Sequence, residues 1–449
     1  MSEPIISVSG LRGIVGESLT PQVAARYVAA FAQTLRPGNS AGPVVVSRDG
    51  RANGPQIVEG VFAGLAHANR PILYADVAST PTLGVLVRHQ HAAGGIQVSA
   101  SHNPAEYNGL KLFSAEGRVI PAEAGKQVLA TYRSAEWRAD LAAGKHERLS
   151  SVTRDHRSLV AATIDGPRIS RAKFNVLLDS NAGAGGLLGM ELLASLGCEA
   201  RCLGREPTGQ FLHKPEPTAE NLAGICQQVS AAGAGIGFCQ DPDADRLAII
   251  DEAGRYIGEE YTLALCVHHV LSQTPGPIVT NCATSRMTED LAKKYGVPFY
   301  RSAVGEANVV DKMIDVGAVF GGEGNGGPID PRVGVVRDSF VGMALVLDAM
   351  ASRQKKVSEL VAELPRYEIV KRTAKLSPEK LPAALDLIEK HFRDGRADRL
   401  DGLRLDWPDR WLIVRGSNTE PIVRAIAEAP TAVAAEDLVT ATCSLIGRV

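Results

Sequence analysis

The sequence lacks the features that mark membrane-spanning, secreted and nucleic-acid-binding proteins. Among its 449 residues, 48 Lys and Arg nearly balance 50 Asp and Glu, and no long basic run occurs. No positive field therefore points to nucleic acid as a partner. No apolar stretch approaches the ~20 residues needed to cross a bilayer, and the N-terminus has no basic region followed by an apolar signal segment. We expect a cytoplasmic protein that binds neither nucleic acid nor a membrane.

The sequence also lacks a cysteine pattern for disulfides or zinc and a complete dinucleotide-binding fingerprint. The seven cysteines are odd in number and dispersed, and they include no C-x-x-C pair. Reduced thiols that pack as small hydrophobes fit this pattern better than disulfides or a zinc site. A glycine-rich stretch after residue 180 falls short of a dinucleotide-binding fingerprint, because Leu188 stands where the third glycine belongs. We interpret these glycines as the tight turn between a strand and a helix.

What the sequence does contain is a regular alternation of strand-like and helix-like segments. Such alternation predicts mostly parallel sheets with helices on both faces. The last part of the chain changes to paired strands with two helices, which is typical of a small α+β domain. We therefore predict three successive mixed-sheet α/β domains at residues 1–155, 156–255 and 256–365, followed by a C-terminal α+β domain at 366–449. Within the first domain, we expect residues 9–13 to form a loop and residues 122–160 to be helical and to include the connection to the second domain.

The stretch SASHNPAEYNGLKLF at residues 99–113 places one hydroxyl, that of Ser101, in a polar turn. The apolar residues before it predict a short strand that ends at the serine. Pro104 fixes its own backbone angle and disfavours helix at the preceding Asn103. Open α/β sheets keep their chemistry at strand ends, so Ser101 is a candidate reactive group. An ordinary polar loop with a helix cap explains the same residues.

The motif DPDADR places three carboxylates, Asp241, Asp243 and Asp245, directly after an apolar run. Carboxylates this close repel one another unless a cation neutralises them, and hard oxygen ligands select Mg²⁺, Ca²⁺ or Mn²⁺. An EF-hand is excluded, because Arg246 stands where that loop requires glycine. Three protein ligands leave a coordination position open, which suits Mg²⁺ that also binds a phosphate oxygen. The alternative is a solvated acidic turn.

Two more loops carry candidate binding groups. In GGEGNGGPI, Glu323 and Asn325 stand on a bare glycine scaffold, and a carboxylate beside an amide can bind neighbouring sugar hydroxyls. RGSNTEP, at residues 415–421, combines a guanidinium, two hydroxyls and an amide, with Arg424 nearby as a second cation. Such a donor-rich loop binds a phosphate dianion. A flexible loop and a hairpin turn are the respective alternatives.

Taken together, these motifs resemble those of the α-D-phosphohexomutase family. SASHNP, DPDADR, GEGNGG and RGSNTEP occur in the family's order along the whole chain, and SGLRG matches its opening loop. The resemblance implies four domains around a central cleft, the fourth closing over it. It further implies that the enzyme moves phosphate between O6 and O1 of a hexose through a phosphoserine at Ser101 and a bisphosphorylated sugar.

The resemblance also assigns roles to individual residues. Ser101 and the three aspartates, Asp241, Asp243 and Asp245, would hold Mg²⁺, and Lys111 or His102 would be the acid/base. Arg12 and Arg246 would steady the phosphoserine loop. The sugar hydroxyls would be bound by Glu323 and Asn325. The phosphate that does not react would be held by polar groups of the last domain: Arg415, Ser417, Asn418, Thr419 and Arg424.

The sugar and the assembly are less constrained by the resemblance. GEGNGG, where many relatives carry a serine and a histidine, resembles the archaeal-type phosphoglucosamine mutase branch, which favours glucosamine phosphate over mannose or glucose phosphate. We expect a hexose 1,6-bisphosphate as activator, a small phosphosugar as partner, and a monomer or homodimer. A metal-dependent sugar phosphatase and a silent sugar-phosphate binding protein are the competing hypotheses.

Overall fold

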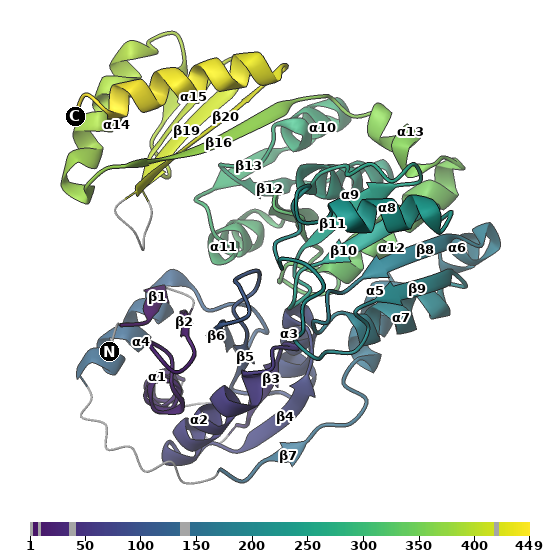
Figure 1. Cartoon of the computed structure of the whole chain (residues 1–449), viewed down its shortest axis with the longest axis vertical. Coiled ribbons are helices and arrows are strands. Elements are labelled where there is room, and N and C mark those ends of the chain that lie inside the picture. Colours follow the sequence, from purple (N-terminus) through teal and green to yellow (C-terminus); the bar gives the residue numbers. More distant parts are fainter. Residues whose placement is uncertain (1–2, 8–9, 36–41, 135–143, 417–421) are drawn as a thin grey trace.

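Four separate sheets organise the computed structural model, which describes residues 3–7, 10–35, 42–134, 144–416 and 422–449 (Figure 1). The three α/β domains and the C-terminal α+β domain expected from the sequence are confirmed. The exact boundaries at residues 155, 255 and 365 stay a prediction. Within the described ranges, no helix is both long and apolar enough to span a membrane.

The first domain has a seven-stranded mixed sheet in the order β1-β2-β6-β5-β3-β4-β7. Its strands are β1 (Ile5–Ser7), β2 (Gly10–Ile14), β3 (Val44–Arg48), β4 (Ile72–Val77), β5 (Gly94–Val98), β6 (Tyr107–Ser114) and β7 (Glu147–Arg148). Its helices are α1 (Pro21–Thr34), α2 (Gly54–His67), α3 (Thr80–His89) and α4 (Ala122–Ser134). Buried apolar residues of β3 and β5 pack with α1 and α2 in one continuous core, so β5 is a rigid base for the loop that follows it.

Two local expectations for this domain were wrong. The described part of SGLRG is not a loop, because Gly10–Ile14 forms β2, which pairs antiparallel with β6. A Cβ on Gly109 would meet the backbone of Leu11 and Ser99, so this glycine allows the strands to approach closely. Residues 122–160 are not helical throughout, since β7 adds parallel to β4 at the sheet edge. Both errors come from pairing with distant strands, which local composition does not reveal.

The second domain is a four-stranded sheet in the order β11-β10-β8-β9. It comprises α5 (Arg154–Ala161), α6 (Gly166–Ala172), β8 (Asn175–Asp179), α7 (Gly186–Ser195), β9 (Glu199–Leu203), α8 (Ala223–Ala231), β10 (Ile236–Gln240) and β11 (Leu247–Asp251). β10 pairs parallel with β8 and antiparallel with β11. The turn between β10 and β11 therefore projects from the carboxyl end of β10, and it carries the aspartate triplet.

The third domain repeats this plan with the order β13-β12-β14-β15. It comprises α9 (Glu259–Gln273), β12 (Ile278–Asn281), α10 (Met287–Tyr295), β13 (Phe299–Ser302), α11 (Glu306–Val316), β14 (Phe320–Glu323), β15 (Gly327–Ile329), α12 (Ser339–Arg353) and α13 (Val357–Ala362). The second and third domains share one large apolar core, to which α9 and α12 contribute many buried residues. The loop with Glu323 thus sits on a scaffold continuous with that of the aspartates.

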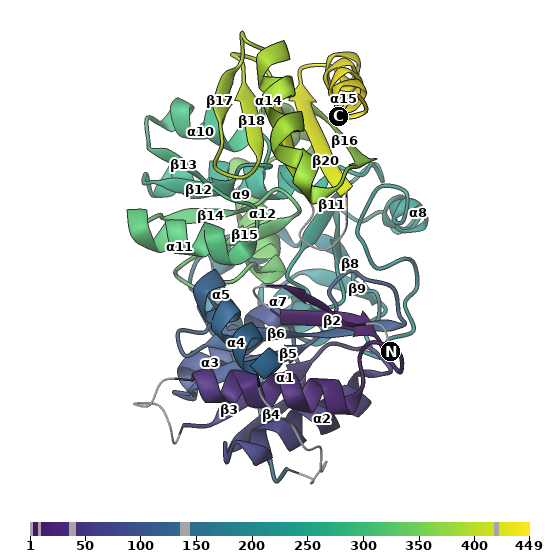
Figure 2. The same ribbon diagram turned by 90° about the vertical axis from the view of Figure 1, so that its left-hand side faces the viewer.

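The C-terminal domain is an antiparallel sheet in the order β16-β20-β19-β18-β17. Its elements are β16 (Glu368–Lys375), a short 3₁₀ turn (Pro378–Lys380), α14 (Leu381–His391), β17 (Arg396–Asp398), β18 (Leu403–Asp406), β19 (Trp411–Gly416), β20 (Ile422–Ala429) and α15 (Ala432–Ile446). Figures 1 and 2 place this domain at one end of the molecule, beside α10 and β13 of the third domain and away from the first. Arg404 joins the two by donating from Nη1 to the carbonyl oxygen of Cys282 at 2.5 Å.

Candidate active site

Ser101 lies at the carboxyl end of β5 in a turn whose backbone is unusual for a serine. Its φ is +51°, in the left-handed region, and its side chain is buried. The Ser101 amide donates a hydrogen bond to Ser99 Oγ at 2.9 Å, which holds this conformation. The hydroxyl donates from Oγ to Asp241 Oδ2 of the second domain at 2.8 Å. The structure therefore brings the serine and the aspartate loop together, although they are 140 residues apart.

Arg51 is a residue of this site that the motif analysis missed. Its buried guanidinium donates from Nη2 to the carbonyl oxygens of Ser101 and Asn103, at 2.7 and 2.6 Å. Nη1 donates to the carbonyl oxygens of Pro104 and Tyr107, at 2.6 and 3.1 Å. Nε donates to a carboxylate oxygen of the loop after β3 at 3.0 Å. All five donors are used, so Arg51 fixes the whole turn from beneath. The only sequence signal was an Asp-x-Arg pattern at a strand end.

The three aspartates form one buried acidic cluster after β10. One ligand oxygen from each of Asp241, Asp243 and Asp245 can be chosen so that all lie within 4.8 Å of one another. Asp241 Oδ1 accepts from the amides of Asp245 and Arg246, both at 3.1 Å, which shapes the turn. Burial, together with repulsion from the other two carboxylates, raises the pKa of Asp241 well above its ordinary value. The cluster is therefore built to receive positive charge.

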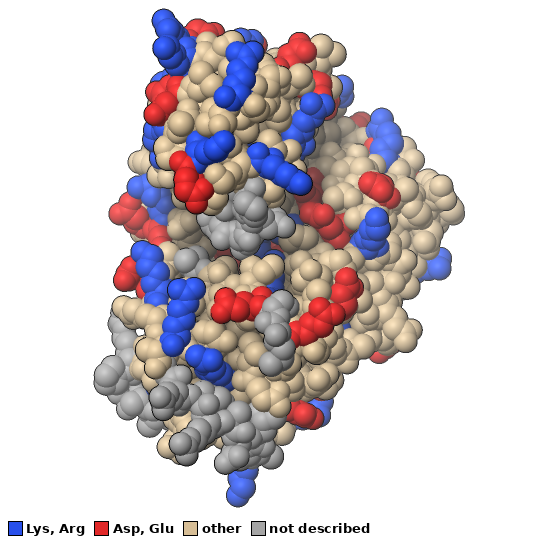
Figure 3. All heavy atoms as spheres, turned by 60° about the vertical axis from the view of Figure 1, so that its left-hand side comes forward, with Lys and Arg blue, Asp and Glu red and all other residues tan. Residues whose placement is uncertain are grey.

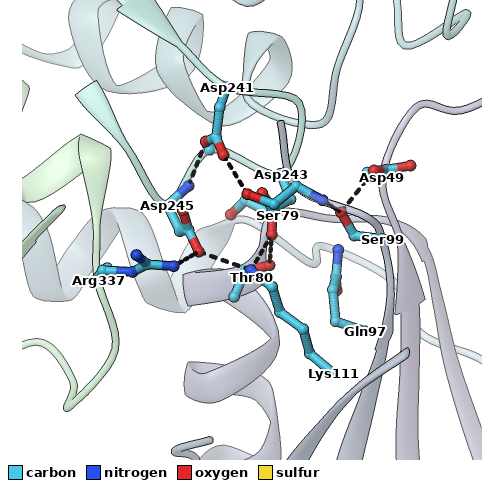
Figure 4. Close-up of polar contacts among 12 residues, drawn as sticks. Asp49, Ser79, Thr80, Gln97, Ser99, Lys111, Asp241, Asp243, Asp245 and Arg337 are labelled. Carbon is cyan, nitrogen blue, oxygen red and sulfur yellow. Dashed lines mark hydrogen bonds and ion pairs between the residues drawn. The ribbon is translucent and has the colours of Figure 1, made fainter. Parts of the chain in front are cut away.

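Two protein cations reach this cluster from other elements (Figure 4). Lys111 on β6 donates from Nζ to Asp243 Oδ2 at 2.6 Å and to Asp245 Oδ2 at 2.7 Å. Arg337 donates from Nη2 to Asp245 Oδ2 at 2.6 Å. Burial alone would raise the pKa of Asp245, but Arg337 and Lys111 outweigh it and hold that pKa below its ordinary value. The attraction of the aspartates likewise outweighs burial at Lys111 and raises the pKa of its ammonium.

The donor set fits Mg²⁺. Asp243 Oδ1 and Asp245 Oδ1 are buried and have no hydrogen-bond partner within the described residues, so each offers an unused oxygen. Asp241 presents a third carboxylate next to the Ser101 hydroxyl. Hard oxygen donors in this number, with room for a phosphate oxygen, are what Mg²⁺ takes in phosphoryl-transfer sites.

The remaining predicted residues around Ser101 also gather here. His102 Nδ1 lies 3.4 Å from Ser101 Oγ. Burial, with help from Arg246 and Arg12, lowers the pKa of His102 well below its ordinary value, so its neutral form is favoured. Arg12 on β2 donates from Nη1 to Asn103 Oδ1 at 3.2 Å, and Arg246 Nε lies 4.0 Å from Asp245 Oδ1. Arg12 thus contacts the serine loop directly, whereas Arg246 belongs to the aspartate turn and acts on His102 through its charge.

Glu323 ends β14 and is held by three partners. Asn281 donates from Nδ2 to Glu323 Oε1 at 2.8 Å, and the Gly305 amide donates to the same oxygen at 3.2 Å. Arg337 donates from Nη1 to Glu323 Oε2 at 2.8 Å. Arg337 therefore links the aspartate cluster to the loop that carries Glu323 and Asn325, a role that the sequence did not reveal. Asn325 Oδ1 is buried and has no partner within the described residues.

The structure describes only part of the predicted phosphate-binding loop at residues 415–421. Arg415 on β19 donates from Nε to Asp401 Oδ2 at 3.0 Å. Arg424 on β20 is its register partner. The other predicted residues of this loop lie outside the described residues: Ser417, Asn418 and Thr419.

A cavity of about 530 Å³ lies between the C-terminal domain and the other three. Figure 3 shows this side of the molecule, with a hollow beneath the C-terminal domain in which acidic side chains are visible. The lining residues come from all four domains and include His102, Glu216, Glu260, Asn281, Glu323, Asn325, Lys371 and Arg424. The volume suits a monosaccharide phosphate. Together, fold and site define a four-domain α/β protein with a serine–carboxylate centre at one end of a polar cleft.

Comparison with known proteins identifies this class. Models of the phosphoglucomutase/phosphomannomutase α/β/α domains I, II and III match residues 5–139, 156–254 and 259–367, and the model of the C-terminal domain matches residues 369–444. The chain belongs to the phosphoglucomutase/phosphomannomutase family.

Individual relatives agree with this assignment and differ in the sugar that their names state. A Thermococcus kodakarensis protein named phosphoglucomutase/phosphomannomutase is 34% identical over 94% of this chain and 93% of its own length. A Methanopyrus kandleri protein named probable phosphoglucosamine mutase is 31% identical over 96% and 95%. The crystal structure of a phosphoglucomutase/phosphomannomutase family protein from Burkholderia thailandensis superposes with a TM-score of 0.84 at 26% identity, covering 99% of this chain and 98% of that one.

Proposed function

We propose that this protein is a phosphohexomutase that interconverts glucosamine 6-phosphate and glucosamine 1-phosphate through a phosphoserine and a bisphosphorylated sugar. The observation that carries the proposal is the contact between Ser101 Oγ and Asp241 Oδ2, which sets the Ser101 hydroxyl against a buried acidic triplet. The cleft beside it is lined by Glu323 and Asn325 and, on the side of the C-terminal domain, by Arg424, whose register partner on β19 is Arg415. These are the parts that moving a phosphoryl group within one sugar requires.

In this proposal Ser101 alternately gives and accepts the phosphoryl group. Arg51 fixes the turn so that Oγ stays aimed at the cluster. Asp241, Asp243 and Asp245 would hold Mg²⁺, which supplies charge neutralisation for the transferring phosphoryl group. Two side chains can carry the sugar hydroxyl proton: His102, favoured as the neutral imidazole, and Lys111, held as an ammonium by two carboxylates. Burial keeps His102 neutral and able to accept a proton, but the same lowered pKa makes it a weak base, so either His102 or Lys111, once it has lost its proton, would take the base role.

The rest of the cleft binds and turns the sugar. Glu323 and Asn325 of the bare glycine loop line the cavity, where they would accept hydrogen bonds from sugar hydroxyls. Arg415 and Arg424 would hold the second phosphate, with Ser417, Asn418 and Thr419 of the same loop. A bisphosphorylated intermediate would present either phosphate to Ser101 after turning over, which also explains a hexose 1,6-bisphosphate as activator.

The decisive experiment follows the product. Glucosamine 6-phosphate is incubated with the protein, Mg²⁺ and a trace of glucose 1,6-bisphosphate, and the products are resolved by phosphorus NMR. We expect the 1-phosphate to accumulate to an equilibrium mixture. Release of free phosphate alone would identify a phosphatase and refute the proposed mutase activity. If mannose or glucose 6-phosphate is turned over with a far higher kcat/KM than glucosamine 6-phosphate, the proposed mutase activity stands but its preferred substrate is a different sugar.

A further inference from the structure

Glu260 is a carboxylate of the cleft to which no motif drew attention. It lies in the first turn of α9 and lines the same cavity as Glu323 and Asn325. Its Oε2 accepts a hydrogen bond from the amide of Ser285 at 3.0 Å. The side chain is therefore fixed at the cavity wall by a backbone contact and does not swing freely.

The loop that carries Glu323 and Asn325 packs directly against the Glu260 carboxylate. A Cβ on Gly324 would lie 1.9 Å from Glu260 Oε2, so a larger residue at this position would displace the Glu260 carboxylate. The Gly324 amide is held in turn by Thr284 Oγ1 at 3.1 Å. Because Gly324 lies directly between Glu323 and Asn325, Glu260 sits within the group of residues proposed to contact the sugar.

The charge of Glu260 is not matched in the way that the charge of Glu323 is. Glu323 has an ion pair with Arg337 at 2.8 Å, whereas within the described residues no ion pair of 4.0 Å or less reaches Glu260. Burial raises the pKa of Glu260 to about 8, and the positive charge of Lys371 on β16 only partly offsets this. A cation brought into the cavity would therefore find a carboxylate that gains strongly from pairing.

We propose that Glu260 determines specificity for an amino sugar by pairing its carboxylate with the ammonium group of glucosamine phosphate. This inference rests on the mutase activity proposed above and adds the group that selects the sugar. A neutral hydroxyl at the same sugar position, as in glucose or mannose phosphate, gains only an ordinary hydrogen bond from a carboxylate. Discrimination therefore arises from charge at one position of the ring.

The test compares sugars within each variant. Glu260→Gln keeps the shape of the side chain and an oxygen for the Ser285 amide but removes the charge. We expect kcat/KM for glucosamine 6-phosphate to fall about tenfold or more, while the values for glucose and mannose 6-phosphate stay within about threefold. Glu216→Gln is the matched control, since this carboxylate lines the same cavity and is half exposed. We expect this control variant to change kcat/KM for all three sugar phosphates by a common factor.

The outcomes separate the two proposals. An equal loss for all sugars, or no change for any, would show that Glu260 acts through the fold or through Lys371, and would overturn its role as selector while the mutase stands. No mutase turnover of any sugar by the unmodified protein would overturn the proposed function itself. If Glu260→Gln fails to fold, binding to the unmodified protein decides: glucosamine 6-phosphate should bind about tenfold more tightly than N-acetylglucosamine 6-phosphate, and equal affinities would refute the inference.

Discussion

Arg51 Nη2 donates a hydrogen bond of 2.7 Å to the carbonyl oxygen of Ser101, and the same guanidinium reaches three more carbonyl oxygens of the serine turn. Four of its five hydrogen bonds go to backbone carbonyl oxygens and the fifth to Asp49 Oδ2, so this buried arginine is a fixed support. The left-handed φ of +51° at Ser101 is thus held by surrounding contacts and not by the preference of serine itself.

The first prediction tests this support. Arg51→Lys replaces five donors in a planar fork by three on a single nitrogen, leaving buried carbonyl oxygens without partners. We expect the free energy of unfolding to fall by about 3 kcal/mol, measured by urea denaturation, together with loss of turnover. Arg148→Lys is the control, because that arginine is 70% exposed. Equal stability of the two variants would show that the turn does not depend on Arg51.

A second prediction concerns the reactive hydroxyl. Ser101→Ala removes the oxygen proposed to carry the phosphoryl group, so we expect kcat to fall by about three orders of magnitude or more and sugar-phosphate binding to remain. Intact mass spectrometry after incubation with glucose 1,6-bisphosphate should show a phosphoryl group on the unmodified protein and none on the variant. Ser195→Ala, at the end of α7, should keep both properties. A variant at position 101 that is still phosphorylated or active would move the reactive group elsewhere.

A third prediction uses the position of Lys111. Its Nζ is shared between Asp243 and Asp245, so its charge competes with a divalent ion for the same two carboxylates. Lys111→Met removes this competitor, and we expect Mn²⁺ to bind about tenfold more tightly, measured by electron paramagnetic resonance of free Mn²⁺. Lys126→Met, on the exposed face of α4, serves as control. Weaker Mn²⁺ binding by the Lys111 variant would mean that the ammonium helps to shape the cluster.

A fourth prediction concerns pH and the contact between His213 and Asp179 in the second domain. Burial favours neutral His213, but the hydrogen bond from its Nε2 to Asp179 Oδ2, at 2.7 Å, outweighs burial and raises the His213 pKa in the folded protein. A raised folded pKa contributes stability that is fully present below the unfolded value of about 6.5 and is lost as pH rises through the folded pKa.

The measurement follows from that sign. His213→Gln should lower Tm more at about pH 5.5 than at about pH 8.5, relative to the unmodified protein. The exposed His391, at the end of α14, gives the control variant His391→Gln, for which we expect no comparable trend. A loss of Tm that is independent of pH would show that the His213–Asp179 contact contributes only as a neutral hydrogen bond.

The local sequence pattern was sufficient to predict the domain architecture, but it was insufficient to predict the short strands that form only by pairing with distant segments. The alternation of strand and helix, and the paired strands near the C-terminus, follow from periodicity that each segment carries within itself. The strand β2 was missed because Gly10 and Gly13 disfavour a strand, and pairing with β1 and β6 on its two sides makes one. β7, two residues long, likewise exists only because β4 offers a free edge.

The sequence by itself determined which groups carry the chemistry: one hydroxyl at a strand end, three aspartates at alternate positions, and two polar loops. These groups are set by spacing along the chain, which any reader of the sequence has. Only the tertiary structure decided what stands beside them. Arg51 under the serine turn, Lys111 and Arg337 at the aspartates and Glu260 at the sugar loop come from distant segments. Their effects depend on burial and on charges separated by ångströms, and those exist only once the chain has folded.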